Sequence, residues 1–178
     1  ATVLTTGCAR TTVAFDACTH ATAVARVVLL RGSAALALEG PGSPLPDAAP
    51  ATAAALAPAG DVAVAGHLDG TVRIWETASG RERACVRLEG AGTTACSGRG
   101  PRGGRIDDLV VTPDGRSAIV ATAAGAVVSV DLGTASVATV LPQRPVAAQV
   151  VSATADGRVL VGFDDGDVVI VGRSGTPE

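Results

Sequence analysis

The chain has 178 residues, of which 47% are hydrophobic and 17% are charged, and its net charge is −3 at pH 7. This composition excludes intrinsic disorder over most of the chain and predicts a packed core. The acidic balance offers no general attraction for nucleic-acid phosphates or anionic membranes, and the aromatic residues are only Trp75, Phe15 and Phe163. We therefore expect neither nucleic acid nor a membrane as a partner.

Short β-strand patterns separated by glycine turns repeat along the chain. The turn glycines of three copies are, in chain order, Gly60 and Gly70, Gly115 and Gly125, and Gly157 and Gly166. Asp-Gly and Ala-Gly dipeptides accept a positive φ in tight hairpins, so each copy is predicted to be a run of antiparallel strands. Units of about forty residues with four short strands are typical of propeller blades.

Two segments resemble a known family. Residues 69–80, with the sequence DGTVRIWETASG, are similar to the third strand and exit turn of a WD40 repeat, with Glu76 where Asp is usual. Residues 112–116, TPDGR, resemble the turn between the first two strands of that family. Only Asp69 and Trp75 match the buried polar network that such repeats often carry. Blades packed mainly through Val, Ala, Ile and Leu are therefore expected, and a quinoprotein-like propeller is the near relative.

The resemblance implies an all-β fold, namely a β-propeller of four-stranded antiparallel blades, with about four blades present as part of a larger ring. In chain order, we expect a degenerate incomplete blade at 1–32, a Pro- and Gly-rich linker at 33–50, a blade with the WD-like strand at 51–90, a Gly- and Arg-rich inserted loop at 91–104, a blade at 105–141, and a blade lacking its last strand at 146–178. The first blade is expected to lack its innermost strand. Residues 33–38 are open to either a strand or a linker assignment.

Certain residues are predicted to have structural roles in these blades. They are Gly60, Gly70, Trp75, Gly115, Gly125, Gly157 and Gly166. The glycines are assigned to hairpin turns and Trp75 to packing between blades. Because the first residues include no initiator Met, we expect the chain to begin inside a longer protein.

The four cysteines fit no zinc-ribbon spacing. They are Cys8, Cys18, Cys85 and Cys96. We expect free thiols in a reducing compartment. The alternatives are a zinc site that combines Cys with His20 or His67, or two disulfides in a secreted domain.

Arg99, Arg102 and Arg105 lie in the Gly-rich loop and are the candidate partner contacts, because guanidinium groups clamp carboxylates and phosphates. Solvated loop charge is the alternative interpretation.

Two other polar groups are interpreted as turn residues. The acidic group around Gly166 (Asp164, Asp165 and Asp167) is interpreted as a hairpin turn rather than a calcium loop. His67, near Asp69, is interpreted as a surface histidine of a turn rather than as half of a proton-transfer pair.

The sequence contains no nucleophile elbow, Walker loop, HExxH or dinucleotide fingerprint. The resulting hypothesis is a cytoplasmic WD40-like scaffold, not an enzyme, that binds protein partners or neighbouring domains of a longer chain. No cofactor, metal or small-molecule ligand is expected. The alternatives are a propeller enzyme, quinoprotein-like or lactonase-like, with catalytic groups largely outside this chain, and a structural subunit of a large assembly.

Overall fold

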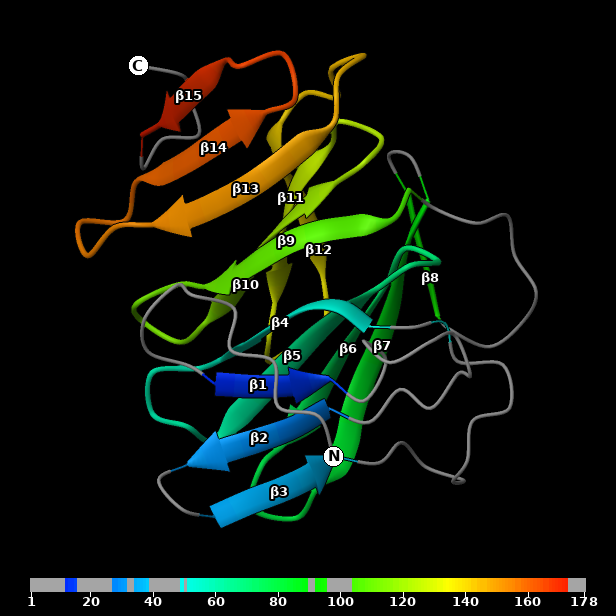
Figure 1. Cartoon of the computed structure of the whole chain (residues 1–178), viewed down its shortest axis with the longest axis vertical. Helices are drawn as coiled ribbons and strands as arrows, with labels where there is room; N and C mark the ends of the chain where they lie inside the picture. Colours follow the sequence, from blue (N-terminus) through cyan, green and yellow to red (C-terminus); the bar gives the residue numbers. More distant parts are fainter. Residues whose placement is uncertain are drawn as a thin grey trace.

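The structure is a computed structural model that describes residues 12–15, 27–31, 34–38, 49, 51–89, 92–95 and 104–172. The described residues form four antiparallel sheets, named A to D here in chain order (Figure 1). Among them, no helix has the length and apolar character needed to cross a membrane.

The strands follow one another in simple hairpin order. Sheet A contains β1 (Thr12–Phe15), β2 (Val27–Arg31) and β3 (Ala34–Leu38). Sheet B contains β4 (Ala51–Leu56), β5 (Val62–His67), β6 (Thr71–Glu76), β7 (Arg81–Glu89) and β8 (Gly92–Ala95). Sheet C contains β9 (Ile106–Val111), β10 (Ser117–Thr122), β11 (Val127–Asp131) and β12 (Val137–Leu141). Sheet D contains β13 (Ala148–Ala153), β14 (Val159–Phe163) and β15 (Val168–Val171).

The first strands of sheets B, C and D lie side by side, with β9 between β4 and β13 (Figure 1). One apolar cluster joins sheets B and C and includes Val64, Ile74 and Ile106. A second cluster joins sheets C and D and includes Ile119 and Phe163. The second strands β5 and β10 are therefore buried on both faces, which explains their nearly continuous apolar sequences.

The repeated turns depend on glycine because their backbone is left-handed. Positive φ values are found at Gly60, Gly70, Gly80, Gly115, Gly125, Gly157 and Gly166. At Gly125 there is a second requirement, since a Cβ atom there would overlap the carbonyl oxygens of Arg144 and Val146. This turn therefore needs glycine for its φ and for the close approach of the neighbouring chain segment.

The structure contains two strands outside the expected blades. β3 occupies residues 34–38, in the segment left open between a strand and a linker, and pairs with β2. β8 occupies residues 92–95, inside the expected inserted loop, and adds a fifth strand to sheet B. Glycine and proline flank both strands, so their short patterns are typical of loops. Only three strands are described in sheet D, the segment expected to lack its last strand.

The expectation of four free thiols is wrong at Cys85, which is disulfide-bonded. Widely spaced cysteines carry no sequence signal that separates a thiol from a disulfide, because the pairing depends on which strands become neighbours.

Candidate functional site

Each first strand of sheets B, C and D contains a bulge at an equivalent place. In β4, Ala51 pairs with His67 and Ala53 with Gly66, which leaves Thr52 as the extra residue. The same register shift leaves Asp107 extra in β9 and Gln149 extra in β13. A bulge redirects a side chain out of the regular alternation. The repeat therefore places a polar side chain near the start of three neighbouring strands.

Hydrogen bonds across the first strands hold the sheets together. The Thr52 hydroxyl on β4 donates to the carbonyl oxygen of Ile106 on β9 at 2.5 Å. The Val151 amide on β13 donates to Oδ2 of Asp108 on β9 at 2.9 Å. Burial raises the pKa of the Asp108 carboxyl, with a smaller contribution from neighbouring Asp107, and the amides of Val151 and Leu109 oppose that rise. Thr52 and Asp108 thus each form a hydrogen bond with a backbone group of the first strand of the next sheet.

Asp107 holds the Arg105 guanidinium at the start of β9. Oδ1 of Asp107 accepts a hydrogen bond from Nε of Arg105, while Oδ2 is buried and has no partner among the described residues. The Arg105 side chain is 48% exposed and the Asp107 side chain only 6%. The cation is consequently the member of the pair that solvent or another molecule meets.

Backbone hydrogen bonds join the segments around Arg105 into one surface, which we name the Arg105 edge. It comprises residues 104–105, the turn 122–126, the link 142–147 and the turn 163–167. The amide of Ala123 donates to the Arg105 carbonyl at 2.8 Å, that of Arg144 to Gly125 at 3.1 Å, and that of Asp164 to Ala147 at 3.0 Å. The edge is therefore built from two blades and the chain between them.

Arg144 is the second ordered cation of the Arg105 edge. Its guanidinium lies 4.3 Å from the centre of the Phe163 ring and 2.6 Å from a carboxylate oxygen of Asp167, and it also pairs with Asp165 at 3.6 Å. The hydrogen bond to Asp167 raises the pKa of Arg144. The acidic residues around Gly166 thus form a hairpin turn whose carboxylates orient Arg144.

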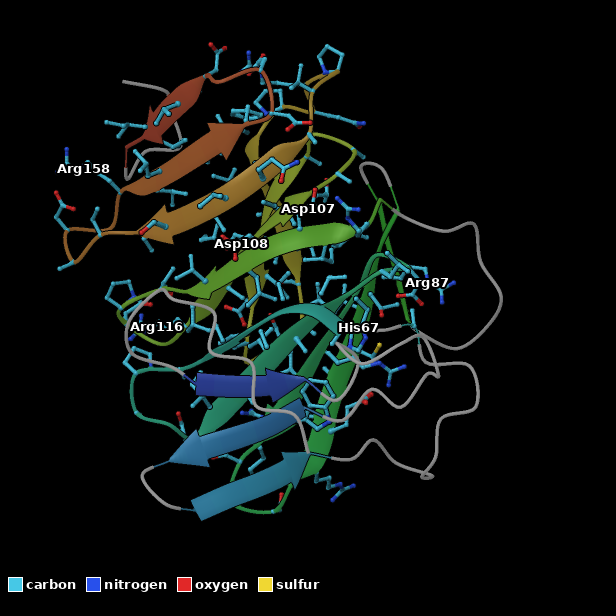
Figure 2. The ribbon with its side chains drawn as sticks, viewed as in Figure 1. His67, Arg87, Asp107, Asp108, Arg116 and Arg158 are labelled. Atoms are coloured by element: carbon cyan, nitrogen blue, oxygen red, sulfur yellow. The ribbon has the colours of Figure 1, made fainter. Side chains whose placement is uncertain are left out.

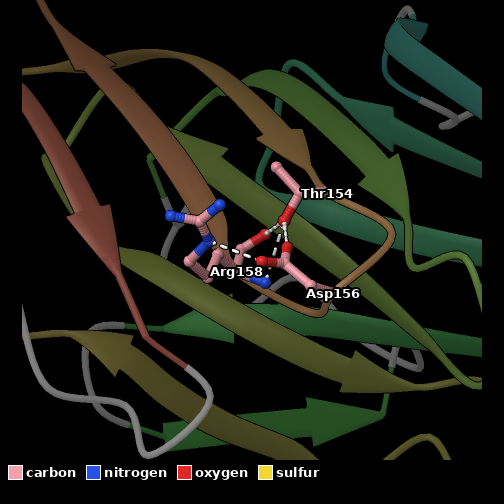
Figure 3. Close-up of polar contacts among 3 residues, drawn as sticks. All are labelled: Thr154, Asp156 and Arg158. Atoms are coloured by element: carbon pink, nitrogen blue, oxygen red, sulfur yellow. Dashed lines mark hydrogen bonds and ion pairs between the residues drawn. The ribbon is translucent and has the colours of Figure 1, made fainter.

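The opposite edge carries the turns between first and second strands, where Figure 2 shows Arg116 and Arg158 on the same side of the molecule. In the turn after β13, the Thr154 hydroxyl donates to Asp156, the Arg158 amide donates to the Thr154 hydroxyl at 3.0 Å, and Arg158 Nε donates to Asp156 at 2.8 Å (Figure 3). In the corresponding turn of sheet C, the Thr112 hydroxyl likewise donates to Asp114, and the Arg116 amide donates to the same Asp114 oxygen at 3.1 Å. These polar residues serve the turn itself.

The interpretation of His67 as a surface residue is wrong, because it is fully buried as the last residue of β5. Nδ1 donates to the Ala49 carbonyl at 2.7 Å, and Nε2 has no hydrogen-bond partner among the described residues. Burial lowers the pKa of His67 to about 4. The ring is therefore neutral near pH 7.

Of the predicted contact residues, the structure describes Arg105, while Arg99 and Arg102 lie outside the described residues. The candidate residues named from the sequence include neither Asp107 nor Asp108. The signal was available, because two carboxylates directly precede an apolar run that begins a blade. The bulge at Asp107 has no sequence signal of its own.

No protein-family model and no curated protein match this chain. Among solved structures, it is similar to the crystal structure of the β-propeller domain of Cps50 (Swd1) from Myceliophteria thermophila, with a TM-score of 0.58 and 16% sequence identity. The match covers 72% of this chain and 40% of that chain. The chain thus spans less than half the length of this propeller. Its sheets have the fold of β-propeller blades.

Proposed function

We propose that this chain is part of a WD40-like scaffold that binds other proteins, and that the Arg105 edge is its contact surface. The observation that carries the proposal is the exposed Arg105 guanidinium held by the buried Asp107 carboxylate. Arginine is enriched among residues that dominate protein interfaces. A guanidinium already oriented by a carboxylate loses less conformational freedom when a partner binds.

The rigid backbone around Arg105 supports this choice of edge. Loops carry binding functions most effectively when a scaffold positions them, and the hydrogen bonds donated by Ala123 and Arg144 join the segments of this edge to one another. Arg99 and Arg102 precede Arg105 in the sequence and are proposed to extend the same contact. The fold similarity supports a scaffold role only as an analogy, since a fold does not determine a function.

A structural disulfide persists in oxidising compartments, so the bond at Cys85 argues against the predicted cytoplasmic location. We propose that the chain is not an enzyme, because its sequence contains no nucleophile elbow, Walker loop, HExxH or dinucleotide fingerprint.

Site-specific photocrosslinking tests the proposed edge. A photoreactive residue is placed at Ala124, which is exposed on the Arg105 edge, and separately at Ala155, which is exposed in the turn on the opposite edge. We expect covalent adducts with other proteins from position 124, fewer from position 155, and a loss of the 124 adducts in Arg105→Gln. Equal adducts from both positions, or adducts that Arg105→Gln leaves unchanged, contradict the proposal.

A further inference from the structure

The bulge residues of the three first strands differ in their ability to donate a hydrogen bond. Thr52 on β4, Asp107 on β9 and Gln149 on β13 are equivalent, because each is the extra residue of the same register shift. A threonine hydroxyl both donates and accepts, an amide does so through separate atoms, and an ionised carboxylate only accepts. One position of the repeat therefore has a different chemistry in each sheet.

Thr52 shows which group such a bulge residue faces. Its hydroxyl donates to the carbonyl oxygen of Ile106 at 2.5 Å, and Ile106 directly precedes the bulge residue of the next first strand. Between β9 and β13, the equivalent carbonyl is that of Ala148, which directly precedes Gln149. Asp107 has no hydrogen to give to that carbonyl. The donor that Thr52 supplies between sheets B and C is thus replaced by an acceptor between sheets C and D.

Asp107 also has an unused acceptor atom. Its side chain is only 6% exposed, and its Oδ1 accepts a hydrogen bond from Nε of Arg105. Its Oδ2 is the only oxygen among the buried side-chain atoms that have no partner in the described part of the chain. A carboxylate oxygen removed from water costs free energy unless a donor meets it, and charged donors form the strongest hydrogen bonds with it. A positively charged donor therefore fits this oxygen best.

Gln149 offers a second acceptor on the neighbouring strand. The residue is half-buried, and no hydrogen bond joins its side chain to another described residue. The strands β9 and β13 are neighbours, so Asp107 and Gln149 occupy equivalent positions on adjacent strands. A cation with several N–H groups can donate to both side chains.

The charges of this part of the molecule favour a basic partner. The Arg105 edge and Asp107 together contain two guanidiniums and four carboxylates, namely Arg105 and Arg144, and Asp107, Asp164, Asp165 and Asp167. Both guanidiniums are already paired with carboxylates of this set. Excess negative charge attracts a positively charged partner and speeds its association.

We propose that Oδ2 of Asp107 binds a lysine or arginine side chain of the protein that contacts the Arg105 edge. This inference rests on the function proposed for that edge and specifies the chemistry of its partner. The ammonium or guanidinium group of the partner donates one hydrogen bond to Oδ2 of Asp107 and another to the amide oxygen of Gln149. Arg105 keeps its hydrogen bond to Oδ1, so both oxygens of the buried carboxylate then have donors.

Nuclear magnetic resonance of the full 178-residue chain, labelled with nitrogen-15, tests this site. The probe is the peptide acetyl-Gly-Ser-Lys-Ser-Gly-amide, and its control has norleucine in place of lysine, which keeps most of the side-chain length without the charge. We expect saturable shifts of the Asp107 and Gln149 amide signals with the lysine peptide alone. The dissociation constant should rise at least about tenfold in Asp107→Asn, which keeps the shape and removes the charge. Asp61→Asn is the matched control, because it removes the same charge from an exposed turn outside this edge.

A second variant keeps the test informative if Asp107→Asn does not fold. Gln149→Ala removes a half-buried side chain without a hydrogen bond to another described residue, so it should fold and should also weaken binding of the lysine peptide. Thermal melts establish the folding of both variants.

Three results overturn the proposal. The first is the absence of saturable shifts at Asp107 up to high millimolar lysine peptide, which leaves Oδ2 to water. The second is equal binding of the norleucine peptide. The third is binding that a folded Asp107→Asn or Gln149→Ala leaves unchanged, or that Asp61→Asn weakens equally.

The function proposed for the Arg105 edge fails by a different measurement. Adducts from position 124 that Arg105→Gln removes, found without binding of the lysine peptide, keep the edge as the contact surface and reject only the basic side chain at Asp107. Binding of the lysine peptide without such adducts keeps the cation site and rejects the contact surface.

Discussion

Asp108 and Val151 connect two sheets through a single hydrogen bond, in which the Val151 amide donates to the Asp108 carboxylate at 2.9 Å. Asp108→Ala removes the acceptor and leaves a partly buried amide without a partner, which should lower the free energy of unfolding by about 1–3 kcal/mol. Asp108→Asn keeps an acceptor oxygen and should lose less. Urea denaturation measures the change, with the exposed Asp164→Ala as a control. Equal stability of Asp108→Ala and the parent chain contradicts the connection.

Gly125 and Gly166 distinguish two reasons why a turn requires glycine, namely a positive φ and a lack of space for a Cβ atom. Both have positive φ, 81° and 90°, but a Cβ atom overlaps backbone oxygens at Gly125 and meets nothing at Gly166. Gly166→Ala should cost about 1 kcal/mol for the left-handed backbone alone. Gly125→Ala adds a steric clash and should cost more. Thermal melts of both variants test this order, and a reversed order refutes the packing described at Gly125.

Trp75 is 2% exposed and packs with Ala63 and Ala65 on the face of sheet B that is turned away from sheet C. Trp75→Ala should lower the free energy of unfolding by about 3–5 kcal/mol, because small neighbours cannot fill the cavity. Leu68→Ala, at a residue 48% exposed, should change it little. Because Trp75 is the only tryptophan in the sequence, denaturation of both variants is followed by far-ultraviolet circular dichroism instead of tryptophan fluorescence. Similar losses for the two variants are the result that contradicts this packing.

His67 should make stability depend on pH. Its pKa falls from 6.5 to about 4 on burial, so the unfolded chain binds a proton more readily between these values. The neutral ring contributes its full share to the free energy of unfolding above about pH 6.5. As the pH falls from 6.5 toward 4, the free energy of unfolding decreases by roughly 3 kcal/mol. Denaturation curves at pH 7 and pH 5 should differ more for the parent chain than for His67→Gln. If the parent chain and His67→Gln lose the same stability between pH 7 and pH 5, His67 is not the group responsible for the pH dependence.

Cys85 should have a specific disulfide partner. In the ladder of β7 with β8, Val86 pairs with Ala95. The residue that follows Ala95 in the sequence is a cysteine, Cys96, so we expect Cys96 to be the partner. Peptide mapping without reductant should find Cys85 linked to Cys96, and Cys85→Ser should cost about 2–4 kcal/mol. A bond from Cys85 to Cys8 or Cys18 disproves the expected pairing.

Local chemistry explains which parts of the fold could be predicted. Gly115 and Gly157 follow Asp, and their positive φ values are those that an Asp-Gly hairpin requires. β8 was not predicted and β3 was left open between a strand and a linker, because each adds to the edge of an existing sheet. Their own sequences, next to glycine and proline, carry little information about such pairing.

The site was less predictable because its geometry depends on contacts between sheets. His67 is adjacent to a turn, where an exposed side chain is the ordinary expectation, and only neighbouring segments make it buried. Asp107 and Asp108 are adjacent in sequence, yet the bulge at Asp107 gives them different partners. Asp107 pairs with the exposed Arg105, whereas Asp108 accepts a hydrogen bond from Val151 in the next sheet. Arg105 was identified from its residue type alone, without the carboxylate that orients it.

Sheet C contacts sheets on both sides, whereas among the described strands sheet D contacts only sheet C. In an array whose units are coupled mainly to their nearest neighbours, stability is a sum of intrinsic and interfacial contributions. The terminal unit then has half of the coupling that an internal unit has. Sheet D, like sheet A at the other end of the array, should therefore unfold more readily than sheet C, which is coupled on both sides.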